Sequence, residues 1–439
     1  MAEEIRCRFA PSPTGKVHIG NIRAAIYNWL FARHTGGKFL LRVEDTDLER
    51  STPEAIKVLF ECMEWLGLDY DEEVFYQTKN VKRHLEVVDQ LLKMGRAYKV
   101  EKTSRDGKTG EVVMFKMPKE GTIEFDDIVK GHMAKKAEDI QDFAIVRSDG
   151  SPIFHIANVV DDIDQRVTHI IRGDDHVENT FKHIEIFKAL GAPIPKYGHL
   201  SMIVNQQGKP YSKRDGAAFV GEYREQGYLP EALFNYLLLL GWNPGGDREV
   251  LTRQEMIDLF ELEKVHVTAA MFDPKKLAWM NGEYVKQIPA DQFKAEVEKV
   301  FGRAGAPSHA ADPDAWWKLF IEQTQPRTKF LSDIKNNIYF FSDDYPVDPK
   351  AVEKRLNKPG VKEILLDLVP RFEAISDWKA PVMEEMVKGL SQGQGMGPWV
   401  HPIRVAVSGR MDGPGLFEML ELLGKEKTIE RLRKAAESL

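Results

Sequence analysis

The chain has 439 residues, 43% of them hydrophobic and 29% charged, and a formal net charge of −7. This balance is that of ordinary globular proteins, and the length favours about two to four domains. Only two cysteines occur, Cys7 and Cys62, which excludes a disulfide framework and a cysteine-rich zinc site. The first residues carry no signal-peptide pattern, and the most apolar stretch, 233–242, is too short to cross a bilayer. We therefore expect a cytoplasmic protein.

The acidic balance argues only weakly against a nucleic-acid partner, because large RNA-binding enzymes carry local basic faces on an acidic surface. Basic side chains cluster at 130–136, 209–214 and 431–434. Most clusters of this kind are solvated helix faces, so none of the three predicts an RNA contact by itself.

The first half of the chain alternates strand and helix patterns. Thr52 and Pro53 supply a capping residue and a first-turn proline for one helix, and Gly36 and Gly67 end two helices. Such an order predicts a Rossmann-like α/β domain with a doubly wound parallel sheet. In chain order, the expected elements are a strand at 6–10, a helix at 19–35, a strand at 39–43 and helices at 53–66 and 84–94.

The pattern changes between residues 98 and 155. Asp106-Gly107 and Asp149-Gly150 stand between strand-like runs, as hairpin turns do. We interpret this segment as an α+β module inserted into the nucleotide fold, after which helix and strand patterns resume at 157–190.

Beyond Pro230 the chain has mostly helical periodicity, so we expect an all-α region behind the α/β front. Thr252 and Glu255 form a capping-box pattern at the start of one helix. The glycines of 391–398 predict a flexible loop before the last helices. Breaks between the rear helices are expected at Pro346, Pro359, Pro370 and Pro381.

The segment 8–21, RFAPSPTGKVHIGN, follows a predicted strand and opens a predicted helix. A helix start offers unpaired N–H donors and a positive dipole end, both suited to phosphate. His18 and Asn21 lie three apart on one face of the first turn and can donate to phosphate oxygens. Gly15 and Gly20 let a ligand approach the backbone. On spacing alone, a plain strand–turn–helix junction that contains a histidine is an equal alternative.

A second glycine-bounded loop, 208–216 (GKPYSKRDG), is basic. A mobile lysine such as Lys213 could neutralise charge that builds on a pentavalent α-phosphate or on departing pyrophosphate. A lone Ser-Lys-Arg loop is usually surface, so the pair of loops, rather than either one, indicates nucleotide chemistry.

Together the two loops resemble the HIGH and KMSKS signatures of class I aminoacyl-tRNA synthetases, and further segments resemble the bacterial-type glutamyl-tRNA synthetases. The resemblance runs in order over essentially the whole chain. It is carried by segments 9–15, 42–47, 157–162, 171–176, 272–281 and 413–417, which read FAPSPTG, RVEDTD, ANVVDD, IRGDDH, FDPKKLAWMN and GPGLF.

The resemblance implies a two-step reaction with catalytic roles for His18 and Lys213. Glutamate is joined to MgATP as glutamyl-adenylate and then passed to the terminal ribose of tRNA-Glu. Charging of tRNA-Gln and a need for tRNA during activation stay open. The implied ATP contacts are Thr14, Gly15, His18, Gly20, Asn21, Ser212, Lys213 and Arg214. The implied glutamate contacts are Arg8, Ala10, Ser12, Glu44, Phe154, Asn158 and Arg172. ATP and Mg²⁺ are the implied cofactors, no protein-held metal is expected, and a monomer is the family default.

The chemistry of glutamate supports these assignments. Two carboxylates need two well-placed cations, or one cation and several donors. Glu44 is the natural partner for the ammonium group, and Arg8 and Arg172 are the natural partners for the carboxylates. Glutaminyl enzymes of similar fold carry an uncharged residue in the place of Arg172, so a guanidinium there favours glutamate over glutamine. Without the flanking motifs, a structural ion pair would be the simpler interpretation of Glu44 and Arg172.

Three residues depart from the family pattern. Asn21 replaces the last histidine of HIGH, a change that this branch tolerates. Pro210 replaces the first lysine of KMSKS, which leaves Lys213 to act largely alone or with Lys209. Phe154 stands where tyrosine is usual, so a hydroxyl contact to the substrate is missing or made by water.

The resemblance also implies the domain order, and because the inserted module has no cysteine we expect no zinc in it. The expected segments are 1–97 (first half of the catalytic nucleotide-binding domain), 98–156 with an alternative end near 175 (inserted acceptor-end-binding module), 157–225 (second half, with the KMSKS-like loop), 226–287 (helical stem-contact region) and 288–439 (all-α anticodon-binding region).

Three other functions are compatible with parts of this pattern. A truncated paralogue that glutamylates a modified tRNA base lacks the helical region that 288–439 supplies. Small-molecule nucleotidyltransferases with a HIGH-type loop are usually much shorter. A non-catalytic RNA-binding relative is disfavoured by the intact His18, Lys213, Glu44 and Arg172.

Overall fold

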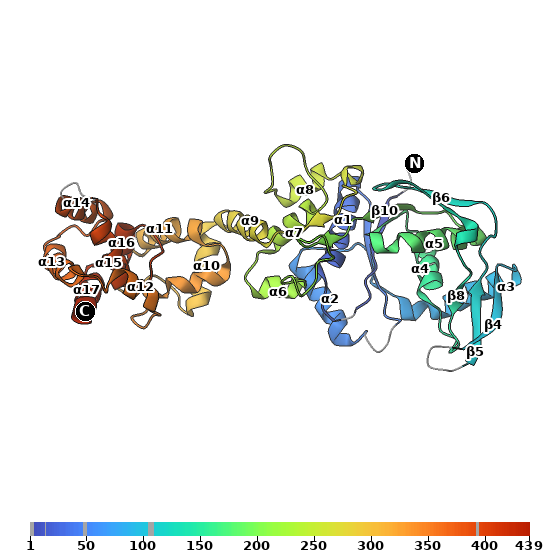
Figure 1. Cartoon of the computed structure of the whole chain (residues 1–439), viewed down its shortest axis with the longest axis horizontal. Helices are drawn as coiled ribbons and strands as arrows, with labels where there is room; N and C mark the ends of the chain where they lie inside the picture. Colours follow the sequence, from blue (N-terminus) through green and yellow to red (C-terminus); the bar gives the residue numbers. More distant parts are fainter. Residues whose placement is uncertain (1–3, 14, 47–50, 104–108, 392–394) are drawn as a thin grey trace. The chain divides into compact units, whose positions relative to one another are not determined.

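The computed structural model describes residues 4–13, 15–46, 51–103, 109–391 and 395–439. Its internal contacts divide the chain into two units, 1–277 and 278–439. Figure 1 draws the first unit in blue to yellow and the second in yellow to red. Within the described ranges, no helix is both long enough and apolar enough to cross a bilayer.

Seven strands form the central sheet of the first unit: β1 (Arg6–Phe9), β2 (Lys38–Val43), β3 (Phe75–Tyr76), β6 (Thr122–Asp127), β7 (Gly131–Lys136), β9 (His169–Gly173) and β10 (Lys196–Leu200). Their spatial order is β3-β2-β1-β9-β10-β6-β7. All neighbours pair in parallel except β6 and β7, which form an antiparallel hairpin at one edge. The predicted parallel sheet is therefore confirmed, and the antiparallel edge is an addition to it.

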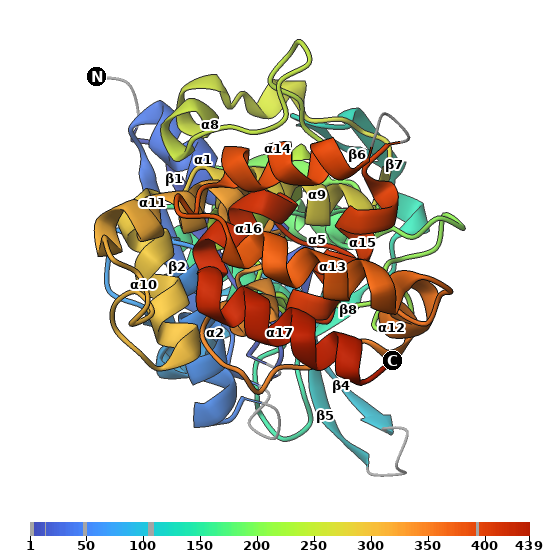
Figure 2. The same cartoon turned by 90° about the vertical axis from the view of Figure 1, so that its left-hand side faces the viewer.

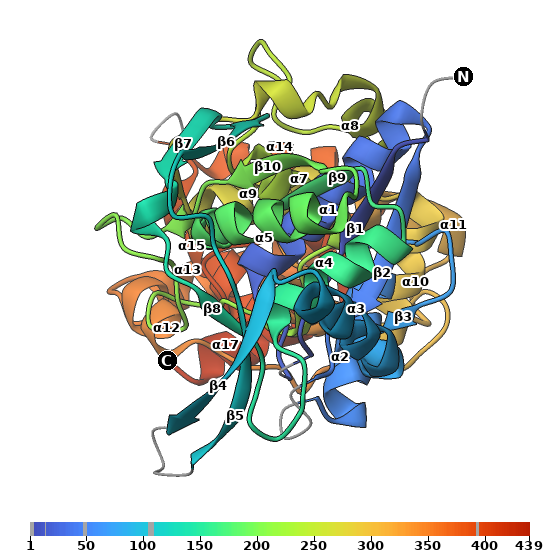
Figure 3. The same cartoon turned by 90° about the vertical axis from the view of Figure 1, so that its right-hand side faces the viewer.

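Helices cover both faces of this sheet, namely α1 (Ile19–Thr35), α3 (Val81–Lys93), α4 (Phe154–Asp164) and α5 (Val177–Leu190). Because side chains alternate along a strand, β9 shows which helix covers which face. The ring of His169 lies 5.0 Å from that of Phe31 in α1. The next residue, Ile170, joins an apolar core with Phe181 of α5 and with residues of α3 and α4. Figure 3 shows these three helices together on the near side of the sheet.

The remaining helices and strands of the first unit include α2 (Pro53–Trp65), α6 (Val220–Glu225), α7 (Pro230–Leu239), α8 (Arg253–Leu259), β11 (Ile203–Val204) and β12 (Ala270–Met271), and α9 (Pro274–Lys286) spans the boundary between the units. Local signals set several helix ends where the sequence predicts them. Gly36 ends α1 with a left-handed φ of 68°. The Thr52 side chain caps α2, and Thr252 with Glu255 forms the predicted capping box of α8.

The inserted segment contributes to two different sheets. β4 (Ala97–Thr103), β5 (Thr109–Phe115) and β8 (Phe143–Val146) form a separate antiparallel sheet. The β6–β7 hairpin instead extends the central sheet, where Asp127 pairs with Tyr197 of β10. Two of the five strands of this segment, β6 and β7, therefore complete the central sheet.

The two predicted hairpin turns of this segment have different outcomes. Gly150 lies in a turn with φ 83°, and Val146 and Pro152 on either side of it form an antiparallel bridge. After the turn the chain forms this single bridge rather than a longer strand, because α4 begins at Phe154. The other turn, Asp106-Gly107, lies outside the described residues.

The second unit is helical throughout its described residues, with α10 (Ala290–Phe301), α11 (Pro313–Thr324), η6 (Leu331–Phe340), α12 (Pro349–Arg355), α13 (Val361–Glu373), α14 (Ala380–Leu390), α15 (Gly397–Ser408), α16 (Leu416–Leu423) and α17 (Lys425–Glu437). The helix α17 packs along α13 and α15 (Figure 2). Trp316 and Trp317 are 7% and 4% exposed, so they belong to the core of this unit and present no stacking surface.

One predicted helix break in this unit is wrong. Pro370 lies inside α13 rather than between helices. Its missing N–H frees the carbonyl of Leu366, one turn earlier, and the side chain of Leu366 is 50% exposed. Because that side of the helix faces water, solvent can satisfy the carbonyl and the helix continues. The predicted glycine-rich loop falls partly on residues 392–394, which lie outside the described ranges, and α15 begins within it.

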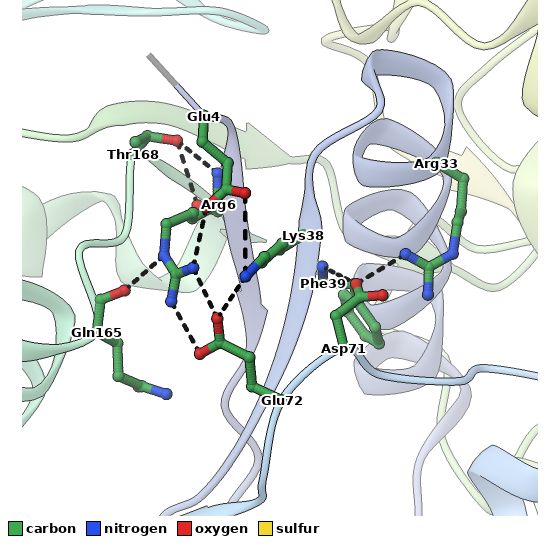
Figure 4. Close-up of polar contacts among 9 residues, drawn as sticks. All are labelled: Glu4, Arg6, Arg33, Lys38, Phe39, Asp71, Glu72, Gln165 and Thr168. Atoms are coloured by element: carbon green, nitrogen blue, oxygen red, sulfur yellow. Dashed lines mark hydrogen bonds and ion pairs between the residues drawn. The ribbon is translucent and has the colours of Figure 1, made fainter.

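Ion pairs join the amino-terminal ends of the central strands (Figure 4). Arg6 of β1 donates through Nη1 and Nη2 to the two carboxylate oxygens of Glu72, at 2.8 and 3.0 Å. Lys38 of β2 donates to the same carboxylate at 3.0 Å, and Arg6 Nε donates to the Gln165 carbonyl at 2.8 Å. The loop before β9 is held too, because Thr168 Oγ1 accepts from the Arg6 backbone at 2.8 Å. The network joins four segments at the end of the sheet opposite the cleft described below.

Replacement of Glu72 by glutamine tests this network. The hydrogen bond from Arg6 is the main cause that lowers the pKa of Glu72 to about 2, from an ordinary 4.5. A carboxylate with a lowered folded-state pKa stabilises the fold above the unfolded pKa, and this contribution is lost as the pH falls toward 2. Since the side chain is 37% exposed, we expect Glu72→Gln to destabilise the protein by only about 0.5–1 kcal/mol at pH 7.

The measurement is urea unfolding at several pH values, with Glu73→Gln as the matched control. Glu73 is exposed and forms no ion pair with a described residue. The gap between wild type and Glu72→Gln should shrink as the pH falls below 4.5. A gap that is equally large in the control, or that grows on acidification, would contradict the assignment.

Candidate active site

A cleft of about 620 Å³ opens at the carboxyl ends of β1, β2 and β9. This edge of a parallel sheet is where α/β proteins bind ligands. Of the residues that the sequence predicts for the site, the cleft is lined by Arg8, Ala10, Ser12, His18, Gly20, Asn21, Glu44, Phe154, Asn158 and Arg172. Pro210 and Tyr211 of the second loop, which directly precede the predicted ATP contact Ser212, also line the cleft. The two distant loops therefore share one cleft.

Four described residues of the prediction do not line this cleft, and a fifth, Thr14, lies outside the described residues. The first of the four, Gly15, has a φ of 102°. Ser212, Lys213 and Arg214 follow Tyr211 on the second loop, and Lys213 lines a neighbouring hollow together with Gly216 and Glu222.

His18 is the N-cap of α1, and its hydrogen bonds fix its tautomer. Nδ1 accepts from the backbone N–H of Gly20 at 3.0 Å, so the ring proton is on Nε2. The ring also hydrogen-bonds the backbone of Tyr211. Burial lowers the pKa of His18, and that backbone contact opposes it only in part. At neutral pH the ring is an uncharged donor at the start of a helix.

Backbone contacts fasten the segment after the second loop to the first loop. The N–H of Ile19 donates to the carbonyl of Ala218 at 3.0 Å, and the N–H of Val220 donates to the carbonyl of Val17 at 3.0 Å. Lys16 reaches the same segment, 5.3 Å from the ring of Phe219. The two loops are thus joined by strand-like pairing beside the cleft.

The second loop itself is closed by Asp215. One oxygen of this carboxylate accepts from the backbone N–H and the hydroxyl of Ser212, both at 2.9 Å. The other accepts from the side-chain amide of Asn205 at 2.7 Å. These bonds lower the pKa of Asp215 and keep it ionised. Lys213 is carried at the tip of this closed loop.

A buried ionic network lies on the floor of the cleft. Arg8 Nε and Arg42 Nη1 donate to the same oxygen of Asp162, at 3.1 and 2.7 Å. Arg42 Nη2 and the amide of Asn158 donate to Glu44 Oε1, at 3.4 and 2.6 Å. Burial raises the pKa of Glu44, while Arg42 and Arg8 oppose that rise. Two guanidinium groups therefore face two carboxylates, and the network is electrically balanced.

Sequence reasoning missed Arg42 and Asp162 as members of the site. Both stand inside segments that carry the family resemblance, at 42–47 and 157–162. Arg42 and Glu44 are two residues apart at the end of β2, which places them on one face of the strand. That spacing could have identified Arg42 from the sequence. No local pattern could have identified Asp162, because its contact with Arg42 joins residues 120 apart in sequence.

Arg172 lies on the same floor with different partners. It is 7% exposed and donates through Nε to His199 Nε2 at 3.3 Å and through Nη2 to Thr180 Oγ1 at 2.6 Å. A further Nη2 bond reaches the carbonyl of His176 at 3.3 Å. Burial lowers the pKa of Arg172 to about 10, which leaves it charged at neutral pH. All of its hydrogen-bond partners among the described residues are uncharged, so none of them balances its positive charge by direct contact.

Phe154 occupies the first residue of α4 and faces the cleft. Its ring lies 5.8 Å from that of His176 and 5.6 Å from that of His183. The wall that it forms is apolar, with no hydroxyl to offer a ligand. Among the described residues, no cluster of His, Cys, Asp or Glu side chains has the geometry to hold a metal ion.

The sheet, the two paired loops and the acidic and basic floor define a class I aminoacyl-tRNA synthetase. A family model for the catalytic domain of class I tRNA synthetases (E and Q) matches residues 4–106 and 100–279, and a model for an anticodon binding domain matches 255–436.

Full-length relatives narrow the class. The chain is 41% identical to a glutamate–tRNA ligase of Francisella philomiragia and to one of Francisella tularensis subsp. novicida, over 99% of both chains in each case. It superposes on the crystal structure of a glutamate–tRNA ligase from Elizabethkingia meningosepticum, in complex with its amino acid, with a TM-score of 0.87, 30% identity and full coverage of both chains. A glutamate–tRNA synthetase from Elizabethkingia anophelis gives a TM-score of 0.85 at 30% identity, over 99% of this chain and 100% of that one. The chain belongs to the glutamate–tRNA ligase family.

The shared position of Asp162 between two arginines predicts a large effect of its removal. Asp162→Asn would leave Arg8 and Arg42 buried with one fewer carboxylate. Breaking a buried charge pair costs about 3–5 kcal/mol, because the remaining charge is uncompensated. We expect a loss of this size in urea unfolding. Asp164→Asn, at an exposed position on the same helix, should cost less than about 1 kcal/mol. Equal stability of the two variants would show that the network carries no such charge balance.

Proposed function

We propose that this cleft activates L-glutamate with ATP and then transfers it to tRNA, with the residues described above in distinct roles. An oxygen of the glutamate α-carboxylate attacks the α-phosphorus of ATP, and the bond to pyrophosphate breaks. The terminal ribose hydroxyl of tRNA then attacks the acyl carbon of the adenylate, and AMP leaves with the bonding electrons. No covalent enzyme intermediate is needed, because positioning and charge stabilisation supply the rate.

The ATP phosphates would lie at the start of α1. The neutral ring of His18 and the exposed amide of Asn21 provide donors there, and the positive end of the α1 dipole favours an anion. Gly20 supports this placement, since a Cβ at that position would lie 3.2 Å from His18 Nδ1 and would crowd the cap. Lys213, assisted by Ser212 and Arg214, would move from the second loop onto the departing pyrophosphate. Mg²⁺ would arrive with the nucleotide, whose phosphates and water supply most of its ligands.

Glutamate would lie over the floor of the cleft. The ammonium group would contact Glu44 and the Oδ1 atom of Asn158, which accepts no hydrogen bond from the described residues. Arg8 uses only Nε within the network, so its Nη groups are available to a carboxylate. The assignment of glutamate as the substrate rests on Arg172. A buried guanidinium with only uncharged partners binds an anion far better than an amide, which favours glutamate over glutamine.

Replacement of Arg172 tests the choice of substrate. Arg172→Gln keeps a polar side chain but removes the charge. Loss of one partner of a buried charge pair costs about 3–4 kcal/mol, so we expect kcat/KM for glutamate to fall about 10²–10³-fold. ATP–pyrophosphate exchange with tRNA present is the measurement, and Arg83→Gln, at an exposed position on α3, is the control. Unchanged glutamate kinetics in Arg172→Gln would refute this role.

The second unit is proposed to read the anticodon, as the anticodon-binding match over 255–436 supports. The region 226–287 is proposed to contact the tRNA stem, and 98–156 is proposed to contact the acceptor end. Some basic residues are unsuited to RNA contact, because Arg431 is 6% exposed and pairs with Asp343 at 3.0 Å. Lys135 similarly pairs with Glu178 at 2.6 Å. We further propose that the protein is a cytoplasmic monomer.

Aminoacylation of separate tRNA-Glu and tRNA-Gln transcripts tests the whole reaction. We expect glutamate, and not glutamine, to be attached to tRNA-Glu, with release of AMP and pyrophosphate. Glutamate on tRNA-Gln would assign the broader tRNA range, and its absence would assign the narrow one. A chain that charges neither transcript, and shows no pyrophosphate exchange with either one, would be a non-catalytic relative.

A further inference from the structure

Three neighbouring strands of the central sheet carry Arg172, His199 and Asp127 side by side. His199 of β10 is the registered partner of Arg172 on β9. Tyr197 of β10 pairs with Asp127 at the end of β6. His199 and Asp127 are 0% and 3% exposed, and neither lines the cleft. A buried histidine–carboxylate pair thus stands directly behind the arginine.

The hydrogen bonds of Asp127 determine which nitrogen of His199 carries the proton. Asp127 Oδ1 accepts from the backbone N–H groups of Val129, Lys130 and His199, at 3.0, 2.8 and 3.2 Å. Although burial would raise it, these bonds and the His199 ring hold the pKa of Asp127 below its ordinary value. Asp127 Oδ2 lies 2.5 Å from His199 Nδ1. An ionised carboxylate can only accept, so Nδ1 carries the proton and Nε2 is an acceptor.

The free acceptor of His199 is turned toward the arginine. Nε2 accepts from Arg172 Nε at 3.3 Å and lies 3.0 Å from the hydroxyl of Thr180. The Thr180 oxygen in turn accepts from Arg172 Nη2 at 2.6 Å. In the opposite tautomer, an N–H would face the donors of Arg172. The guanidinium is therefore held at Nε and Nη2, which leaves Nη1 for the cleft.

We infer that Asp127 and His199 are positioning residues that orient Arg172 for the glutamate carboxylate without neutralising it. The inference rests on the proposed role of Arg172. A carboxylate in direct contact would hold the arginine as firmly but would balance the charge that the substrate needs. Because the imidazole of His199 lies between Asp127 and Arg172, the group that contacts the guanidinium is neutral. The negative charge of Asp127 lies one ring farther away. Partners of this kind commonly fix the orientation of a functional group.

The anchor also explains why the β6–β7 hairpin matters to the cleft. Asp127 belongs to the inserted segment, and it is placed only because β6 joins the central sheet beside β10. The ring of Tyr197 stacks with that of His199, with centroids 6.0 Å apart and an interplanar angle of 6°. Phe125 of β6 lies 6.2 Å from the same ring. These two rings restrict the orientation of the imidazole, and Asp127 fixes its tautomer.

Steady-state kinetics of variants test the inference, with glutamate and ATP varied separately in the full-length protein. Asp127→Asn removes the charge that fixes the tautomer, and His199→Phe removes the acceptor. We expect each to raise the KM for glutamate about 10- to 100-fold, as the loss of a hydrogen bond to a charged group does. The KM for ATP should stay within about twofold, and discrimination against glutamine should weaken. His199→Gln, whose side-chain oxygen can accept from Arg172 Nε, should recover part of the loss.

Two exposed residues outside the segments proposed to contact tRNA provide matched controls. His34 lies near the end of α1, where its Nδ1 is 2.8 Å from the carbonyl of Ile257, and Asp89 lies on α3. Asp89→Asn and His34→Phe make the same replacements away from the cleft and should leave both KM values unchanged. An equal rise of both KM values in Asp127→Asn would indicate a merely structural role and overturn the inference. If Arg172→Gln alone impairs glutamate use, the positioning role fails while the proposed function stands. If none of these variants affects glutamate, the role of Arg172 fails as well.

A measurement on the wild-type protein decides the matter even if the variants fold poorly. Long-range ¹H–¹⁵N spectra of histidine-labelled protein report which ring nitrogen is protonated. We expect His199, assigned by its absence in His199→Gln, to show a protonated Nδ1 and a bare Nε2 at neutral pH. A protonated Nε2 would overturn the inference, because that nitrogen could not accept from Arg172.

Discussion

Charge balance at the carboxyl ends of the parallel strands is the constraint on which the cleft depends. Arg8 and Arg42 are buried because Asp162 and Glu44 are buried with them, and each guanidinium contacts a carboxylate. Such burial is tolerated only when charges are paired and hydrogen-bonded. The floor can therefore exist before any ligand arrives, and it holds its donors in place for one.

Arg172 is the deliberate exception to this balance. Its contacts with His199, Thr180 and the His176 carbonyl fix its direction but leave its charge uncompensated. Burial is the main cause that lowers the pKa of Arg172 to about 10, so burial destabilises its charged form. A bound carboxylate would stabilise the charged form, whereas an amide would not. In the proposed function, specificity for glutamate therefore comes from an ionic contact that forms only when the substrate binds.

The sequence predicted those features of the fold that depend on residues close to one another in the chain. The ends of α1, α2 and α8 lie where Gly36, Thr52 and the Thr252–Glu255 box place them, because caps act within one turn. The parallel sheet was also predictable from the alternation of elements. The joining of β6 to β10 was not, since nothing in either strand specifies a partner some 70 residues away. The continuation of α13 through Pro370 was missed because exposure of the preceding turn is a tertiary property.

The site divides in the same way. Residues in the two loops could be named from motifs, and the cleft brings His18, Glu44 and Arg172 together. The residues that support them, Asp162 and Asp127, act across strands and through other side chains, so no spacing rule identifies them. Because β1 and β9 must lie side by side for Arg8 and Arg172 to line one cleft, the order of strands in the sheet determines which charges meet. Function in this chain is therefore set by topology at least as much as by motif.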